Sequence, residues 1–184
     1  MDTLQQELRE WAQELTCFHL PRWQELPDLE LYMDQVITLV DQYLSPVIQS
    51  EKHSLLTAAM VNNYVKKKII PAPIKKKYNR KHLAFLIAIT SLKQVLVLEE
   101  IRTGILFQAK QIGIRQAYDL FCVTQEQAIQ LIGKQIQGDF STPIANVPLE
   151  LIAVTAAAKS FSGKLLAEKM VQLEKDYLEK VEAK

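Results

Sequence analysis

Apolar residues recur every three or four positions along most of the chain, the spacing of one helix face. The first such stripe predicts a helix that ends before Pro21 and consists of Leu4, Leu8, Trp11, Ala12 and Leu15. A second stripe predicts a helix from Asp28, its expected N-cap, to Leu44. The prolines at 21 and 27 make the segment between these helices extended or turning, because proline disfavours helix in the residue before it.

The middle of the chain predicts two more helices around a proline-marked break. Thr57 is a suitable N-cap for a short helix from Ala58 to about Lys67. Pro71 and Pro73 prevent that helix from continuing. Asn79 can cap the next helix. The inward positions that we expect there are Leu83, Leu86, Ile87, Thr90 and Val95.

The C-terminal half is also helical in pattern. Leu98 begins a helix whose first turn is acidic, which suits the positive end of the helix dipole. After Gly113 the pattern fits either one long helix or two, the second starting at a capping box of Thr124 and Gln127. Residues 138–148 are the clearest loop, and a last helix follows from about Leu149. Its end carries a short, nearly heptad stripe of Leu166, Met170, Leu173, Tyr177 and Val181.

Composition agrees with an all-α protein. Five Gly and seven Pro in 184 residues are too few for a loop-rich β protein. The longest apolar run, Leu83–Leu92, is far short of the roughly 20 residues of a membrane span. The N-terminus lacks the layout of a signal peptide, so we expect a cytoplasmic protein. In that compartment a disulfide between Cys17 and Cys122 is not expected.

Catalytic chemistry finds little support in the sequence. The three histidines, His19, His53 and His82, are scattered and have no metal-ligand spacing. Phosphate-binding glycine motifs, paired cysteines and nucleophile elbows are all missing from the sequence. We therefore expect a protein that is not an enzyme, with no metal and no cofactor.

Charge is distributed unevenly along the chain. The net charge is only +1, yet residues 52–98 hold ten of the 22 Lys and Arg and no acid. An acid-free basic segment of this kind either binds a polyanion or offsets the acidic remainder of its own chain. The spacing of the segment favours polyanion binding, since the short helix has Asn62, Asn63, Lys66 and Lys67 on one face. A simple solvated Lys-rich face is the plainer alternative.

The basic segment continues with Tyr64, with Ile69-Ile70-Pro71 and then with Lys76 and Tyr78. In this order and spacing it resembles MerR-like winged helix-turn-helix domains. Tyr64, Ile69, Ile70 and Pro71 occupy the positions of that family's Tyr, Leu, Ile or Leu, and Pro. Lys76 and Tyr78 occupy the Arg and Tyr of its wing. Three departures stand out. Asn62 replaces an Arg, and Lys68 replaces a Gly. A Gly there indicates a positive φ, so Lys68 should be strained. The first helix of the motif must come from Asp28 to Leu44, which leaves a long loop before Thr57 instead of a tight turn.

A wider arrangement runs from Leu20-Pro-Arg-Trp23 through Asn62-Asn-Tyr-Val65 to Ala117-Tyr-Asp-Leu-Phe-Cys122. It resembles a bacterial family known as DUF1836, a domain of unknown function. The resemblance implies an N-terminal helix over 1–19, a MerR-like winged helix-turn-helix domain over 20–108 and a helical C-terminal part over 109–184. The MerR-like resemblance also implies a recognition helix over about 57–67 and a basic wing over 73–78. It implies that the C-terminal helices form a homodimer or receive an effector signal, and it does not identify the effector ligand.

These observations predict a transcriptional regulator that binds double-stranded DNA as a homodimer, with no membrane association. The helix enters the major groove and the basic loop follows the phosphates, so both must lie on one open face. The alternative is a protein-interaction or scaffold protein that keeps the winged fold without binding nucleic acid. The DNA-binding residues expected are Thr57, Asn62, Asn63, Lys66, Lys67, Lys75, Lys76, Lys77, Tyr78 and Arg80.

Overall fold

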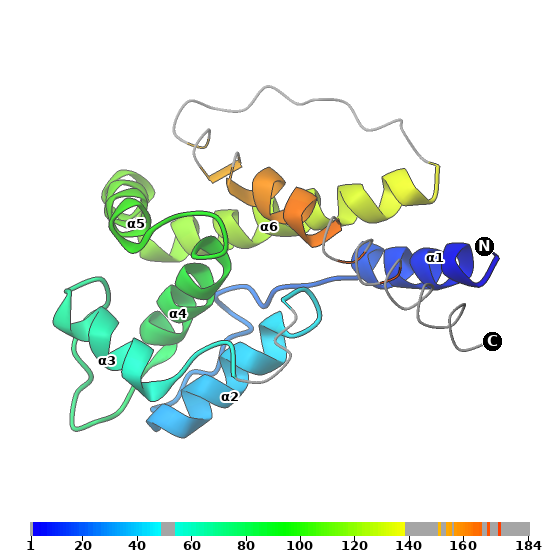
Figure 1. Ribbon diagram of the computed structural model, residues 1–184. Helices are drawn as coiled ribbons and strands as arrows, with labels where there is room; N and C mark the ends of the chain where they lie inside the picture. Colours follow the sequence, from blue (N-terminus) through cyan, green and yellow to red (C-terminus); the bar gives the residue numbers. More distant parts are fainter. Residues whose placement is uncertain are drawn as a thin grey trace. The chain divides into compact units, whose positions relative to one another are not determined.

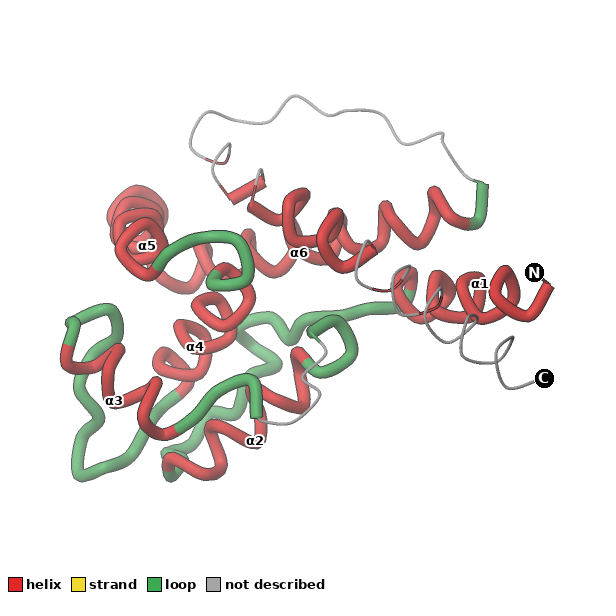
Figure 2. The backbone as a smooth tube through the Cα atoms, viewed as in Figure 1, coloured by secondary structure: helices red, strands yellow, loops and turns green. Residues whose placement is uncertain are grey.

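The protein is helical throughout the part that the structure describes (Figures 1 and 2). This computed structural model describes residues 2–48, 54–138, 151, 154–155, 157–166, 169 and 173. The labelled helices are α1 Asp2–Thr16, α2 Met33–Leu44, α3 Ala58–Lys66, α4 Arg80–Leu92, α5 Leu98–Ile112 and α6 Ile114–Ile136. Residues 157–166 are helical as well. Within these residues the only β pairing is two isolated bridges, which confirms the all-α class.

The chain forms two compact units. Unit 1 comprises Met1–His19 with Gln125–Lys184, and unit 2 comprises Leu20–Thr124. The division therefore falls inside α6, a single helix of 23 residues. Of the two alternatives for this stretch, the single long helix is confirmed, because α6 continues through Thr124. The domain boundary predicted at 108 lies inside unit 2.

In unit 1, α1 approaches the second half of α6 closely. Trp11, Ala12 and Leu15 are buried, as their helical spacing predicts. A Cβ on Gly133 would lie 2.6 Å from the carbonyl oxygen of Ala12, so the contact depends on a glycine. The Gln130 side chain also donates a 3.1 Å hydrogen bond to the carbonyl of Phe18, beyond the end of α1.

The core of unit 2 is built around α4. Nine consecutive or near-consecutive residues of this helix, from His82 to Ser91, are buried. A helix that is apolar on most of its surface must be covered on several sides. It packs against α2, which buries Val36, Val40 and Leu44, and against α5. Helix α3 packs against α2.

The segment before α2 is fixed to the start of α6. The hydroxyl of Tyr118 donates a 2.9 Å hydrogen bond to the carbonyl of Pro21. The backbone N–H of Trp23 donates to the Asp119 carboxylate at 2.6 Å. Burial is the main cause that raises the pKa of the Tyr118 hydroxyl, so this group stays a neutral donor. The extended connector predicted from its prolines is therefore present and anchored within unit 2.

Two predicted features near α2 and α4 are wrong. Helix α2 begins at Met33 rather than near Asp28, and Leu29 is 57% exposed. The reason is that Leu31 forms a β-bridge with Tyr78, which keeps this part of the chain extended. Helix α4 ends at Leu92, so Val95 lies in the following turn and is only half-buried.

Other expectations agree with the structure or fall outside it. Thr57 and Asn79 cap α3 and α4 with their side chains, and α5 begins at Leu98 with an acidic first turn. Cys17 and Cys122 are both free. No helix among the described residues has both the length and the apolar character needed to cross a membrane. The predicted loop over 139–148 and the stripe positions Met170, Tyr177 and Val181 lie outside the described residues.

Candidate nucleic-acid interface

Helix α3 has a buried face and an exposed polar face. Val61 and Tyr64 point into unit 2, and burial raises the pKa of the Tyr64 hydroxyl. The opposite side exposes Asn62, Lys66 and Lys67, whereas Asn63 is half-buried at the flank. Figure 1 shows α3 and the loop after it at the outer edge of unit 2, in cyan to green. The helix therefore presents one polar side to solvent.

The start of α3 is held by a small network. The Thr57 hydroxyl accepts a 3.2 Å hydrogen bond from the backbone N–H of Met60, which caps the helix. The Asp41 carboxylate accepts from the N–H of Leu55 at 2.9 Å, and the Lys93 ammonium donates to the Leu55 carbonyl at 2.8 Å. Burial lowers the pKa of Lys93, and Asp41 opposes that effect. Lys93 therefore fixes the segment before α3 instead of joining the exposed set, although sequence reasoning did not find this role.

Helix α3 ends in a Schellman motif. The N–H of Ile69 donates to the Tyr64 carbonyl at 2.9 Å, and that of Lys68 to the Val65 carbonyl at 3.0 Å. This motif needs a left-handed residue, which is usually glycine. Lys68 takes that position with φ 54°, which confirms the strain predicted from its place in the family pattern. Ile69 and Ile70 are buried and anchor the exit of the helix.

The predicted wing is a tight hairpin. Ile74 and Lys77 exchange two backbone hydrogen bonds of 3.2 and 2.9 Å across a two-residue loop. The loop residues Lys75 and Lys76 have φ 51° and 62°. Two successive positive φ angles define a type I′ turn, where Asn and Gly are the preferred residues. Both lysines are exposed, so the turn holds two positive charges at its tip.

Lys77 lies at the base of the turn and is partly neutralised. Its ammonium is 3.1 Å from the Glu30 carboxylate and 5.9 Å from the centre of the Tyr32 ring. The hydrogen bond to Glu30 raises the pKa of Lys77, with the Glu30 charge acting in the same direction. Lys77 therefore remains charged but carries its own counter-ion.

Tyr78 and Arg80 have structural duties that the sequence did not reveal. Tyr78 is 3% exposed and packs edge-on against His82 at 5.4 Å, so its ring does not reach the surface. Its backbone pairs with Leu31. Arg80 is half-buried, donates to the Leu26 carbonyl at 3.1 Å and pairs with Asp28 at 3.5 Å. The ring of Tyr78 is therefore not exposed for a DNA contact, and the guanidinium of Arg80 is already paired within the chain.

Five lysines remain as the exposed basic set. They are Lys66, Lys67, Lys68, Lys75 and Lys76. Among the described residues none of them forms an ion pair. The members of this set lie at the end of α3 and at the tip of the hairpin. Four of the five were expected from the sequence to be DNA contacts. Lys68 was singled out only for its backbone.

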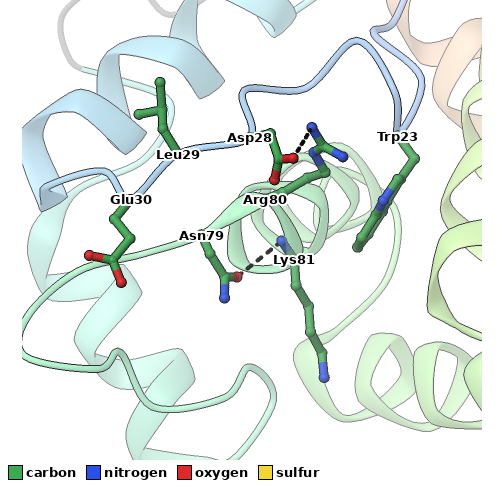
Figure 3. Close-up of a pocket in the computed structure, with 7 residues that line it drawn as sticks. All are labelled: Trp23, Asp28, Leu29, Glu30, Asn79, Arg80 and Lys81. Carbon is green, nitrogen blue, oxygen red and sulfur yellow. Dashed lines mark hydrogen bonds and ion pairs between the residues drawn. The ribbon is translucent and has the colours of Figure 1, made fainter.

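A surface pocket lies between the segment before α2 and the start of α4. Its volume is about 370 Å³, and its lining consists of Trp23, Asp28, Leu29, Glu30, Asn79, Arg80 and Lys81. Figure 3 shows the Arg80 guanidinium between Asp28 and Trp23. Sequence reasoning did not find this pocket. Its acids are already paired with bases of the same chain, and no cluster of metal ligands occurs among the described residues.

Comparison with known proteins places this region in a family. The family model described as Domain of unknown function (DUF1836) matches residues 21–121. The match covers more than half of the chain and includes α3, the hairpin and the pocket. No curated protein and no solved structure matches the chain. On this match over residues 21–121, the chain belongs to the DUF1836 family.

Proposed function

We propose that this protein binds double-stranded DNA through α3 and the hairpin that follows it. The observation that carries the proposal is the placement of strain. Among the described residues other than glycine, those with positive φ are Lys68, Lys75 and Lys76. All three belong to the exposed basic set.

The strain matters because it costs stability. A non-glycine residue in the left-handed conformation is destabilised by roughly 1–2 kcal/mol relative to the right-handed one. Glycine would remove this cost at each position, and Asn would reduce it. Residues that break a local rule without a structural benefit are typical of functional sites. A lysine at each of three positions where glycine fits best supports a need for positive charge at these points.

The order of elements supports a winged helix-turn-helix arrangement of the MerR-like type. Helix α2 is followed by α3 and then by the hairpin, and the bridge between Leu31 and Tyr78 ties the hairpin to the start of α2. In this arrangement α3 enters the major groove and the hairpin follows the backbone. The exposed Asn62 then faces base edges, where an Asn side chain can pair with adenine. Lys66 and Lys67 lie beside phosphates.

The proposed biological role is that of a cytoplasmic transcriptional regulator. A single helix-turn-helix reads only about one half-site, so a homodimer is expected to form the functional unit. We propose that the dimer interface lies in the helices after the winged domain, because the resemblance to MerR-like proteins implies it.

A protein-interaction role is the second candidate, and one observation favours it. Leu106 and Phe107 of α5 are 51% and 49% exposed, next to each other on the helix. Exposed apolar surface of this kind is found at protein contacts when it forms a contiguous patch, and these two side chains point to neighbouring sides of the helix. This surface lies on a different helix from the basic set, so it can serve a scaffold role with or without DNA binding.

Selection from random-sequence duplexes tests the proposal. The purified protein should enrich a defined motif, and Asn62→Ala should change the preferred base at one position. The cost there is roughly 1–3 kcal/mol if Asn62 pairs with adenine through two hydrogen bonds. Asn63→Ala is the matched control, because its side chain is half-buried at the flank and should alter the preference less. No enrichment by the wild-type protein, or an unchanged motif for Asn62→Ala with the fold intact, would count against α3 as the recognition helix.

A further inference from the structure

We propose that Ile74 enters the minor groove of the bound duplex as an apolar wedge and bends the DNA. The inference rests on the proposed DNA binding and deepens it, because it assigns a separate task to the hairpin. In it α3 reads the sequence, the lysines contact phosphates, and Ile74 deforms a base step.

The exposure of Ile74 is the first observation. Its side chain is 68% exposed, more than any other large apolar side chain among the described residues. It contributes little to the core, although isoleucine is among the residue types most often buried. The two hydrogen bonds between Ile74 and Lys77 come from the backbone, so they do not depend on the Ile74 side chain. Ile74 therefore serves no evident role in folding.

Its surroundings are the second observation. Ile74 comes directly before Lys75 and Lys76, and it is paired through the backbone with Lys77. Directly opposed residues in an antiparallel pair have their side chains on the same side. Ile74 thus lies directly before the two exposed lysines of the tip and on the same side of the hairpin as Lys77, whose ammonium pairs with Glu30. The minor groove of B-DNA is about 6 Å wide and is bordered by phosphates on both strands. A narrow hairpin with a charged tip and one apolar side chain matches that chemistry.

The rigidity of the hairpin supports a wedge. Proteins that kink DNA from the minor groove insert an apolar side chain between two bases and partly unstack them. A side chain with few rotamers on a fixed backbone loses little conformational entropy when it inserts. Ile is stiff at χ1, and the two hydrogen bonds between Ile74 and Lys77 fix the turn. Flexible steps such as TA and CA are the places where unstacking is least costly.

An anionic membrane surface is the competing partner for a basic tip with an apolar residue. Membrane binding of this kind depends on a sizeable buried apolar area as well as on charge. The tip offers a single apolar side chain, and its neighbours Lys75 and Lys76 are charged. The duplex is therefore the favoured partner, and vesicles serve as a test of the alternative.

The experiment compares Ile74→Ala with Val97→Ala on duplexes that carry the selected motif. Val97 is the control because it is also β-branched and 65% exposed, but it precedes α5. Affinity is measured by titration, and bending by energy transfer between dyes at the two duplex ends. Ile74→Ala should weaken binding about ten-fold, the loss expected for an uncovered Ile side chain, and should reduce the bend. The salt dependence should stay the same, since no charge is lost. Ile74→Thr, which keeps the β-branch and the strand preference, should show the same loss.

Each outcome decides the question. If the wild-type protein binds no duplex, both the proposed function and this inference fail. If it binds with a normal salt dependence but Ile74→Ala keeps the same affinity and bend, the wedge is wrong and the proposed function stands. Ile74→Ala could instead weaken binding to vesicles of anionic lipid and leave duplex binding unchanged. That result would assign Ile74 to membrane binding and overturn the inference.

Discussion

Lys75 and Lys76 take a backbone conformation that favours other residues. A type I′ turn suits Asn followed by Gly, and each lysine there lowers the stability of the fold. The charges at this tip have no ion-pair partner among the described residues, so they offset none of that cost. Stability and polyanion binding should therefore change in opposite directions when the turn is altered.

The paired substitution Lys75→Asn with Lys76→Gly tests this. It should raise the free energy of unfolding by about 1 kcal/mol, because both residues then suit their backbone. The same protein should bind duplex DNA more weakly, as two phosphate contacts are lost. Denaturant unfolding and duplex titration measure the two effects. A variant that gains stability and keeps full DNA affinity would show that the lysines of the turn contact nothing.

His82 gives a second effect at the scale of one residue. It is 3% exposed, and its Nδ1 accepts a 3.1 Å hydrogen bond from the N–H of Asn79. Burial lowers the pKa of His82, which outweighs the opposite effect of the carbonyls of Ala72 and Pro71. The unfolded chain then binds a proton more readily than the folded chain. His82 therefore contributes its full stabilisation above about pH 6.5, the pKa of a histidine in the unfolded chain. This contribution to the free energy of unfolding falls as the pH drops below that value.

His82→Gln should weaken that pH dependence. Gln at this position can still accept the hydrogen bond that closes the capping box, but it does not titrate. Thermal melts between pH 7 and pH 5 should show a falling melting temperature for the wild type and a smaller fall for the variant. Parallel curves for the two proteins would mean that other groups control the acid sensitivity.

Single residues also show what the sequence can predict. The caps Thr57 and Asn79 were predictable because their chemistry is local. The positive φ of Lys68 was predictable because a glycine is expected at its position in the family pattern. The type I′ turn was not, since two lysines carry no signal for it. The burial of Tyr78 depends on its bridge with Leu31, 47 positions earlier, which no local pattern contains.

At the scale of the helices, the two glycines at 104 and 133 have opposite roles. Both lie inside helices, where Gly→Ala usually stabilises by about 1 kcal/mol. Gly104 in α5 has no atom within 4 Å of an added Cβ. In α6 an added Cβ at Gly133 would lie 2.6 Å from the Ala12 carbonyl oxygen and 2.9 Å from the Thr16 side chain.

Gly104→Ala should therefore stabilise the protein and Gly133→Ala should destabilise it. The helix propensity gained is the same in both, so the difference between them measures the close approach of α1 and α6. Denaturant melts of the two variants provide the values. Equal stabilisation by both substitutions would mean that α1 and α6 are not in close contact at Gly133.

Helix boundaries follow the same division between local and distant information. Most helices were predictable from apolar spacing, and α5 also from its acidic first turn. The start of α2 was not, because the extended pairing of Leu31 overrides the apolar pattern from Leu29. The continuity of α6 was left open because Thr124 and Gln127 resemble a capping box. Both are accommodated inside the helix instead.

At the scale of the whole molecule, charge separates along the chain. Residues 52–98 carry ten basic residues and no acid, and the net charge is only +1. Within unit 2 the acids Asp28 and Glu30 neutralise Arg80 and Lys77. Five exposed lysines, at the end of α3 and at the tip of the hairpin, are left without an ion pair among the described residues. The structure therefore narrows the candidate DNA-binding charges from the ten basic residues of the segment to these five lysines.

Salt dependence of duplex binding tests that account most directly. If these five lysines each neutralise a phosphate, the logarithm of the affinity should fall against that of the salt concentration with a slope on the order of −4 to −5. Lys66→Gln with Lys76→Gln should make the slope shallower by about two units. The control, Lys110→Gln with Lys159→Gln, removes the same charge at two other exposed lysines and should leave the slope unchanged. Absence of binding at low salt, or equal slopes for the two double variants, would contradict the assignment of this surface to DNA.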